Sequence, residues 1–384
     1  MARKKNSKPA RPAALPFEQQ IEDVRNRLQK LESLAGQTSH DVSEEIAFYR
    51  ERLETLTKEV YAGLSSWNRV QVARHPNRPL TSDFLKTVFT DFVELHGDGF
   101  YGDDPAMVTG LAKLGEHSCL VIGQRKGRNV KERLACHFGS AHPEGYRKAL
   151  RKMHLAERMN LPIVCLINTP GAYPGIGAEE RGQARAIAEN IHEMFSLRVP
   201  ILVMVIGEGG SGGALGIAIG DRVGMMENAW YSVISPEGCA SILWRDAEGK
   251  EAAADALKLT ATDMYRLGLV DQIVPEPVGG AHAHPQDAME LVKVQLETWL
   301  TELQAIPTEA LLEARYLKFR HIAAQGSPVT AAISAQDNLA EADPVSGSDE
   351  VSGSGVEPDS RSGQGEVPSS TLTRTPGPPP RHRN

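Results

Sequence analysis

Two short apolar runs constrain the fold of this chain more than any other feature of its sequence. Each begins at a proline, Pro162 or Pro200, and each leads into a glycine-rich stretch, TPGAYPG at residues 169–175 or GEGGSGG at residues 207–213. Both runs are rich in β-branched residues and too short to cross a membrane, so each predicts a buried strand, the second ending at Ile206. Helical patterns follow both stretches. Strands that alternate with helices in this way predict an α/β fold with parallel crossover connections.

The two glycine-rich stretches are predicted to be turns that face the same side of the sheet. Both follow the carboxyl ends of predicted parallel strands, and the prolines that open these strands lie 38 residues apart. Ligands of α/β folds bind beyond such strand ends. Glycine lets the backbone approach a ligand closely, and the first N–H groups of the next helix have no partner within that helix. The turns are therefore predicted to flank one site that can hold negative charge.

The second turn by itself fits several chemistries. Residues 207–212 match the G-x-G-x-x-G pattern of dinucleotide binding, with Glu227 about twenty residues further on. Residues 209–213 match G-x-S-x-G, in which Ser211 would be a nucleophile. In a third interpretation the backbone N–H groups of Gly212, Gly213 and Ala214 form an oxyanion hole, and no nucleophile is needed. A turn that only lets a helix pack close to a sheet is the fourth interpretation.

The remaining chain divides into four segments. Residues 1–16 are basic and residues 326–384 are acidic and rich in serine, glycine and proline, so both are predicted to be disordered. Residues 17–80 contain two helical patterns, which predict an antiparallel helical hairpin followed by an irregular linker. Residues 81–325 form the predicted α/β domain. It begins with a helix over residues 83–95 and a strand hairpin within residues 107–124, and it ends in two helices.

Composition excludes several classes of protein. The formal net charge of −7 and the isoelectric point near 6.0 argue against a general nucleic-acid-binding protein. No apolar run is long enough to span a membrane. The four cysteines are scattered without metal-ligand spacing, which predicts buried thiols in a reducing cytoplasm and no metal site. A basic cluster with Arg125, Lys126 and Arg128 is a candidate for contact with phosphate, although such clusters are commonly solvated surface.

Six stretches in a fixed order carry a resemblance to a known family, namely residues 73–79, 143–149, 169–183, 205–214, 231–244 and 275–281. Residues 17–325 resemble the alpha-subunit family of bacterial acetyl-CoA carboxylase carboxyltransferases, which belongs to the crotonase-like superfamily. The resemblance implies a crotonase-like α/β spiral of ββα units, with the helical hairpin before it and helices after it. One departure is Asn168, where the family usually carries aspartate. A neutral residue there weakens any charged role but leaves the turn intact.

The resemblance also implies a reaction. A carboxyl group passes from carboxybiotin, held by a separate biotin carrier protein, to acetyl-CoA, which gives malonyl-CoA for fatty acid biosynthesis. The biotin ureido oxyanion and the thioester enolate both need stabilisation, which backbone amides can provide. We therefore expect an oxyanion hole from the amides of Gly212, Gly213 and Ala214, opposed by Gly171 and Ala172. The other expected contacts are Tyr173, Gly175, Gly209 and Gly210 to biotin, and Arg125, Lys126 and Arg128 to the phosphates of coenzyme A.

The partners implied by the resemblance are a beta subunit with a zinc ribbon in an α2β2 assembly, the biotin carrier protein, and a biotin carboxylase that uses ATP. This chain would then carry no metal, lie in the cytoplasm and need its beta partner for activity. Two alternatives remain open. Crotonase-like folds also house serine peptidases, in which Ser211 would need a base such as His137, His142 or His192. The second alternative is a non-catalytic scaffold subunit.

Overall fold

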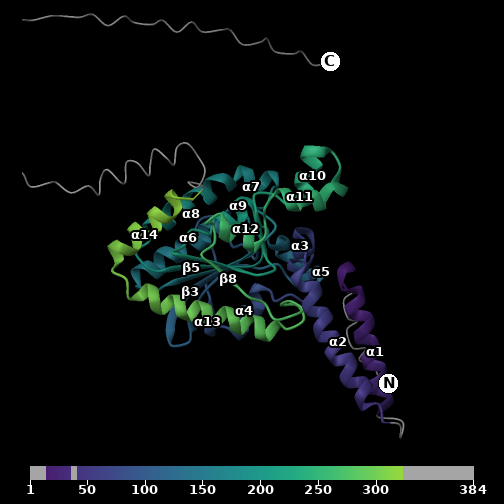
Figure 1. Cartoon of the computed structure of the whole chain (residues 1–384). Coiled ribbons are helices and arrows are strands. Elements are labelled where there is room, and N and C mark those ends of the chain that lie inside the picture. The colour runs from purple at the N-terminus through teal and green to yellow at the C-terminus, as the bar shows by residue number, and fades with distance from the viewer. Residues whose placement is uncertain (1–13, 36–40, 323–384) are drawn as a thin grey trace, which may run out of the picture. The chain divides into compact units, whose positions relative to one another are not determined.

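The computed structural model describes residues 14–35 and 41–322, all within a unit that spans residues 1–331 (Figure 1). The segments predicted to be disordered, residues 1–16 and 326–384, lie outside the described residues except for residues 14–16. The predicted boundary between residues 80 and 81 coincides with the start of helix α4 (Thr81–Thr87). The division into domains remains a prediction.

The described part of the chain contains eight strands that belong to one sheet. Their bounds are β1 Thr90–Glu94, β2 Met107–Leu114, β3 His117–Gln124, β4 Ile163–Thr169, β5 Ile201–Gly210, β6 Arg222–Met226, β7 Trp230–Ser232 and β8 Gln272–Val274. The strand order is β1-β2-β3-β4-β5-β6-β8, and β7 pairs with β5 outside this path. The pairs β1–β2 and β2–β3 are antiparallel, whereas all the other pairs are parallel.

The centre of the sheet forms the core. Every residue of β4 and β5 is buried, as expected for parallel strands covered on both faces. Helices lie on the two sides of these strands: α6 (Pro143–Arg158), α8 (Gln183–Ser196) and α14 (Thr308–Arg320) on one side, α4 and α13 (Pro285–Gln304) on the other (Figure 1). The predicted α/β fold with parallel crossovers is therefore confirmed.

The other helices are shorter or lie outside these layers. They are α1 Gln19–Ala35, α2 Ser43–Ala62, α3 Ser66–Ala73, α5 Val130–Ala135, α7 Ile176–Glu180, α9 Ser211–Leu215, α10 Pro236–Trp244, α11 Lys250–Ala256 and α12 Ala261–Arg266, with 3-10 turns η1 Pro16–Glu18, η2 His137–Gly139 and η3 Ala247–Gly249.

The predicted helical hairpin is formed by α1 and α2. Arg50 contacts Glu32 at 2.7 Å near one end, and the Tyr61 hydroxyl donates to Glu18 at 2.6 Å near the other, so the two helices run antiparallel. The linker that follows is partly helical, contrary to its predicted irregular structure. Helix α3 begins there because the Ser65 hydroxyl accepts a hydrogen bond from the N–H of Asn68 at 3.2 Å.

The helix predicted over residues 83–95 is only half correct. Helix α4 ends at Thr87, and β1 follows as the edge strand of the sheet. Residues 88–93 contain Val88, Phe89, Phe92 and Val93, whose β-branched and aromatic side chains favour a strand once β2 is available for pairing. Register along β1 shifts between Thr90 and Val93, around a residue with positive φ.

The predicted end of the second strand is also wrong. Strand β5 continues to Gly210 instead of ending at Ile206, because its last three residues pair with β7. The glycines there allow close packing: a Cβ on Gly209 would lie 2.7 Å from Cδ2 of Tyr231, and one on Gly210 would lie 2.2 Å from the carbonyl oxygen of Pro170. The second predicted turn, residues 207–213, is therefore only the junction where β5 ends at Gly210 and α9 begins at Ser211.

Candidate functional site

The two strand-end turns are in direct contact. Strands β4 and β5 are parallel neighbours, and Thr169 pairs with Gly209 where both strands end. Helix α9 begins one residue beyond β5, and a Cβ on Gly213 would lie 2.4 Å from the backbone nitrogen of Ala172 and from the carbonyl carbon of Gly171. The two backbones therefore touch without an intervening side chain. The sequence predicts only that both turns face the same side of the sheet.

Unpaired backbone N–H groups gather at this contact. Gly212 and Gly213 belong to the first turn of α9, and neither N–H donates a hydrogen bond within the described residues. In the opposing turn the N–H of Gly171 is engaged, since it donates to the Thr169 hydroxyl at 3.1 Å. The N–H of Ala172 has no such acceptor among the described residues. Gly212, Gly213 and Ala172 are therefore the donors that remain free to hold an oxyanion.

Gln124, which belongs to none of the predicted site motifs, holds the two turns together. Its side-chain nitrogen donates to the carbonyl oxygen of Gly213 at 3.2 Å, and its side-chain oxygen accepts from the N–H of Asn168 at 3.0 Å. The Tyr146 hydroxyl donates to the same Gly213 carbonyl at 3.3 Å. Gln124 is fully buried at the end of β3. A glutamine at the end of an apolar strand was the only signal in the sequence.

Replacement of Gln124 by leucine is expected to lower the free energy of unfolding by about 1–3 kcal/mol, because the buried N–H of Asn168 loses its acceptor. Urea denaturation of the two proteins measures this difference. The matched control is Gln272→Leu on β8, where the side chain is exposed, and a change within about 0.5 kcal/mol is expected. Equal effects of the two substitutions would contradict the role assigned to Gln124.

Asn168 also supports this junction. Its side-chain oxygen accepts from the N–H of Glu208 at 3.2 Å and connects the ends of β4 and β5. This contact requires an oxygen but no charge, so an aspartate could make it as well. The turn after Asn168 is closed by the Thr169 hydroxyl, which also donates to the carbonyl of Gly171 at 2.9 Å.

A cavity of about 380 Å³ opens beside the turns. Asn168, Pro170 and Glu208 line it from the strand ends, together with the cationic side chains of Arg74 and Lys126. Glu208 is buried, and its carboxylate accepts from Nε of Arg74 at 2.7 Å and contacts Nζ of Lys126. These two cations compensate the charge of a buried carboxylate that lines the cavity.

Comparison with known proteins assigns the family. The family described as "Acetyl co-enzyme A carboxylase carboxyltransferase-like" matches residues 14–323. The chain belongs to this family. It is 51% identical over 308 residues to the acetyl-coenzyme A carboxylase carboxyl transferase subunit alpha of Rhodopirellula baltica, covering 80% of this chain and 96% of that protein. A subunit of the same name from Thermus thermophilus is 52% identical over 314 residues, covering 82% and 99%.

Solved structures resemble this carboxyltransferase-family chain only in part. Transcarboxylase 12S has a TM-score of 0.48 at 19% identity, covering 60% of this chain and 42% of that one. The beta subunit of Pseudomonas aeruginosa geranyl-CoA carboxylase has a TM-score of 0.48 at 20% identity, covering 64% and 46%. The chain thus spans less than half the length of these two solved chains. The family assignment rests on the sequence relatives.

The basic cluster of this carboxyltransferase-family chain is paired with acidic side chains. Nη2 of Arg125 lies 3.1 Å from Oε1 of Glu94, and Arg128 contacts Asp83. Lys126 contacts Glu208 as described above. A phosphate group would therefore have to replace these carboxylates at Arg125, Lys126 and Arg128.

The residues expected on the biotin side lie around the same junction. The ring of Tyr173 is half-buried and stacks on His142 with centroids 4.1 Å apart. Gly175 lies against this ring, since a Cβ there would be 2.4 Å from Cε1 of Tyr173. Gly209 and Gly210 are buried in β5, where an added Cβ would meet Tyr231 or Pro170. Tyr173 is therefore the member of this group whose side chain is partly accessible.

Ser211 is the candidate nucleophile of the serine peptidase alternative. Among the residues that the structure describes, its hydroxyl forms no hydrogen bond with His137, His142 or His192. Ser211 instead adopts a φ of 52° at the junction between β5 and α9. The serine peptidase alternative gains no support from this geometry.

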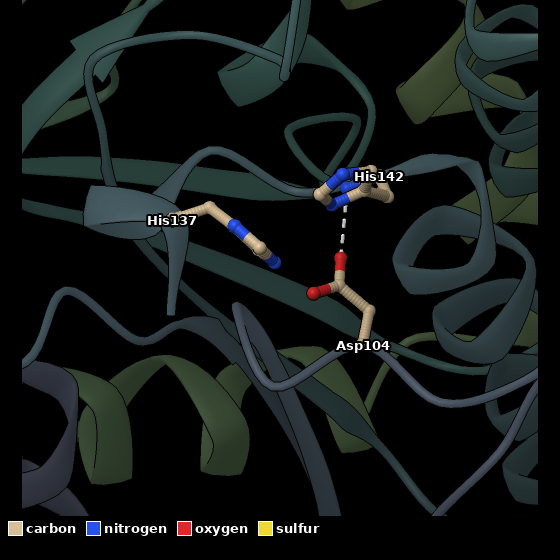
Figure 2. A group of neighbouring side chains, drawn as sticks. All are labelled: Asp104, His137 and His142. Carbon is tan, nitrogen blue, oxygen red and sulfur yellow. Dashed lines mark hydrogen bonds between the residues drawn. The ribbon is translucent and has the colours of Figure 1, made fainter. Parts of the chain in front are cut away.

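A cluster that the sequence did not reveal, drawn in Figure 2, lies beside Tyr173, whose ring contacts those of His137 and His142. Asp104, from the loop between β1 and β2, lies beside His137 and His142, and one potential ligand atom of each lies within 4.8 Å of the others. Burial raises the pKa of the Asp104 carboxyl and lowers the pKa of His142. Asp104 is 33 residues from His137. No known metal-ligand spacing in the sequence could have identified this group.

Two further sequence predictions concern the cysteines and membrane-spanning segments. The four cysteines are all free and buried, which confirms the prediction of buried thiols. Among the described helices, none has both the length and the apolar character that crossing a bilayer would require.

Proposed function

We propose that this chain is the alpha half of a two-chain carboxyltransferase that transfers a carboxyl group from carboxybiotin on a biotin carrier protein to acetyl-CoA. The product would be malonyl-CoA for fatty acid biosynthesis. The observation that carries the proposal is the contact between two strand-end turns that leaves the N–H groups of Gly212, Gly213 and Ala172 without acceptors among the described residues. Such groups can hold developing negative charge without a nucleophile.

The chain's own residues suit a ligand that becomes an anion. Carboxybiotin supplies the carboxyl group when it is bound, and the ureido oxygen gains negative charge as that group leaves. We assign the N–H groups of Gly212 and Gly213 to this oxygen, with Ala214 behind them and Ala172 opposite. The absence of a side chain at Gly213 lets the two turns approach each other closely, whereas a Cβ on Gly212 would face Ile187. Tyr173, at the edge of the turn, would contact the ring system of biotin.

Coenzyme A would approach from the side of Arg125, Lys126 and Arg128. All three cations are held by carboxylates in this chain, so phosphate binding would exchange one set of anions for another. Gly171 shapes the turn rather than donating to the anion, because its N–H is already bound to Thr169.

The partner would be a beta subunit with a zinc ribbon, in an α2β2 assembly that also meets the biotin carrier protein and an ATP-dependent biotin carboxylase. Large apolar side chains exposed around α10 support a partner contact, since Val233, Ile242 and Leu243 are 74%, 70% and 66% exposed. The free, buried thiols suit a reducing compartment such as the cytoplasm.

The purified chain is expected to form no malonyl-CoA from carboxybiotin and acetyl-CoA when alone, and to form it when combined with the beta subunit. Product formation by chromatography measures this. Activity of the isolated chain would contradict the two-chain proposal, and inactivity of the combined chains would contradict the reaction. A Ser211→Ala variant is the control and is expected to retain activity. Its loss of activity, with labelling of Ser211 by a fluorophosphonate, would favour a serine hydrolase.

A further inference from the structure

We propose that Asp104, His137 and His142 form a binding site for one divalent transition-metal ion, with Zn²⁺ as its representative. The three residues offer one carboxylate oxygen and two imidazole nitrogens, all within 4.8 Å of one another (Figure 2). A tetrahedral ion with ligand bonds of about 2.0–2.1 Å separates its ligand atoms by about 3.3 Å. On binding, the distances between the ligand atoms would therefore shorten by about 1.5 Å at most, from the 4.8 Å limit to about 3.3 Å.

The ligand atoms are available. Neither imidazole forms a hydrogen bond within the described residues, although the backbone N–H of His142 does. The Asp104 carboxylate accepts two backbone hydrogen bonds, from Ala106 to Oδ1 at 2.8 Å and from His142 to Oδ2 at 2.8 Å. Each oxygen keeps a second lone pair. These bonds fix the orientation of the carboxylate and leave it able to coordinate an ion.

The buried charge of Asp104 is compensated only in part, by the nearby Lys148 and His142. Its exposed fraction is 2%, and among the described residues no cationic side chain forms an ion pair with its carboxylate. Lys148 lies nearby, but its Nζ donates to the backbone carbonyl of Asp104 at 2.8 Å and contacts the carboxylate of Asp103 at 2.5 Å. Buried carboxylates are normally paired with a cation or bound to a metal. A divalent ion between the histidines and Asp104 would supply the missing charge.

The backbone holds the two histidines in place. His137 and Phe138 both have positive φ angles, 47° and 56°, although neither is glycine. Such conformations cost about 1–3 kcal/mol each and persist only where the surrounding structure holds them. His142 precedes Pro143, the first residue of α6, and its ring stacks on Tyr173. Both imidazoles are half-buried, so an ion can reach them from solvent.

The donor set selects the class of metal. Two imidazoles and a carboxylate bind Zn²⁺ and neighbouring first-row ions, whereas Mg²⁺ and Ca²⁺ prefer sites made entirely of oxygen ligands. Three protein ligands leave at least one coordination position for water. The ion would act as a positioning element, because it would join the loop between β1 and β2 to His142, whose ring supports Tyr173.

The test is titration of the untagged, metal-free, full-length chain without its partner. Zn²⁺ binding is followed by calorimetry and Co²⁺ binding by visible ligand-field absorption. We expect one ion per chain, and His137→Ala and His142→Ala are each expected to weaken binding by at least about tenfold. His154→Ala is the matched control, since His154 lies on α6 and has only distant contacts with Glu157 and Glu193, both at 3.8 Å.

A third variant keeps the test decisive if a histidine variant misfolds. Asp104→Asn keeps an acceptor oxygen for one of the two backbone hydrogen bonds but loses the other acceptor and the charge, and it should weaken Zn²⁺ binding by at least about tenfold as well. Circular dichroism of each metal-free variant shows whether it is folded. Absence of saturable Zn²⁺ binding by the folded parent chain would overturn the proposal. Binding that the folded variants retain at the parent affinity would overturn it too.

Discussion

A Gly213→Ala substitution is expected to lower the carboxyltransferase activity of the reconstituted enzyme by about 100- to 1,000-fold, the usual effect of losing one oxyanion-hole donor. The added Cβ would lie 2.4 Å from the backbone nitrogen of Ala172 and 2.4 Å from the carbonyl carbon of Gly171. The two turns would have to separate, which moves the N–H groups of Gly213 and Ala172 away from a shared oxygen. Steady-state kinetics with carboxybiotin and acetyl-CoA measures the loss.

The neighbouring Gly212→Ala substitution is the control. An added Cβ there meets only the side chain of Ile187, at 3.7 Å, which is an ordinary van der Waals distance. Both substitutions place alanine in the same short helix, so they change helix propensity alike. Gly212→Ala is expected to retain activity within about tenfold. If folded Gly213→Ala protein is as active as this control, the oxyanion-hole assignment is wrong.

Replacement of Arg315 by alanine is expected to lower the free energy of unfolding by about 3–5 kcal/mol, because it leaves a buried charge without a partner. Arg315 is 1% exposed, and its guanidinium donates to both carboxylate oxygens of Asp221 at 2.8 Å. Its other donors reach three backbone carbonyls, those of Met194, Leu197 and Val199. These contacts attach α14 to the end of α8 and the start of β5.

Urea denaturation measures the effect of the Arg315 substitution. Arg320→Ala on the same helix is the control, because Arg320 is exposed and its recorded contact is with the ring of Tyr316, 5.9 Å from the ring centroid. This change is expected to stay within about 0.5 kcal/mol. A similar small effect at Arg315 would show that Asp221 is solvated well enough without its partner. An equal loss of stability at both positions would mean that alanine weakens helix α14 as such, and not that the contacts of Arg315 are lost.

Much of the fold could be predicted from local patterns. The apolar runs after Pro162 and Pro200 became buried parallel strands, and the hairpin of α1 and α2 formed where apolar residues recur every three or four positions. Two of the errors occurred where strand pairing decided the structure. Strand β1 replaced half of a predicted helix because it pairs with β2. Strand β5 extended through the glycines at its end because its last residues pair with β7. Strand propensity depends on neighbours that a linear pattern does not show.

The sequence by itself determined the α/β class, the two glycine turns at strand ends and, through the order of its motifs, the carboxyltransferase family. Those features depend on periodicity and on residue types at short spacing. Only the tertiary structure decided which backbone N–H groups have no acceptor among the described residues. The Thr169 hydroxyl accepts from the N–H of Gly171, whereas the N–H of Ala172 has no such acceptor. The tertiary structure alone brought Gln124 to both turns and Asp104 to His137 and His142. Such contacts join residues 33–89 positions apart, and their geometry depends on how the strands and helices pack.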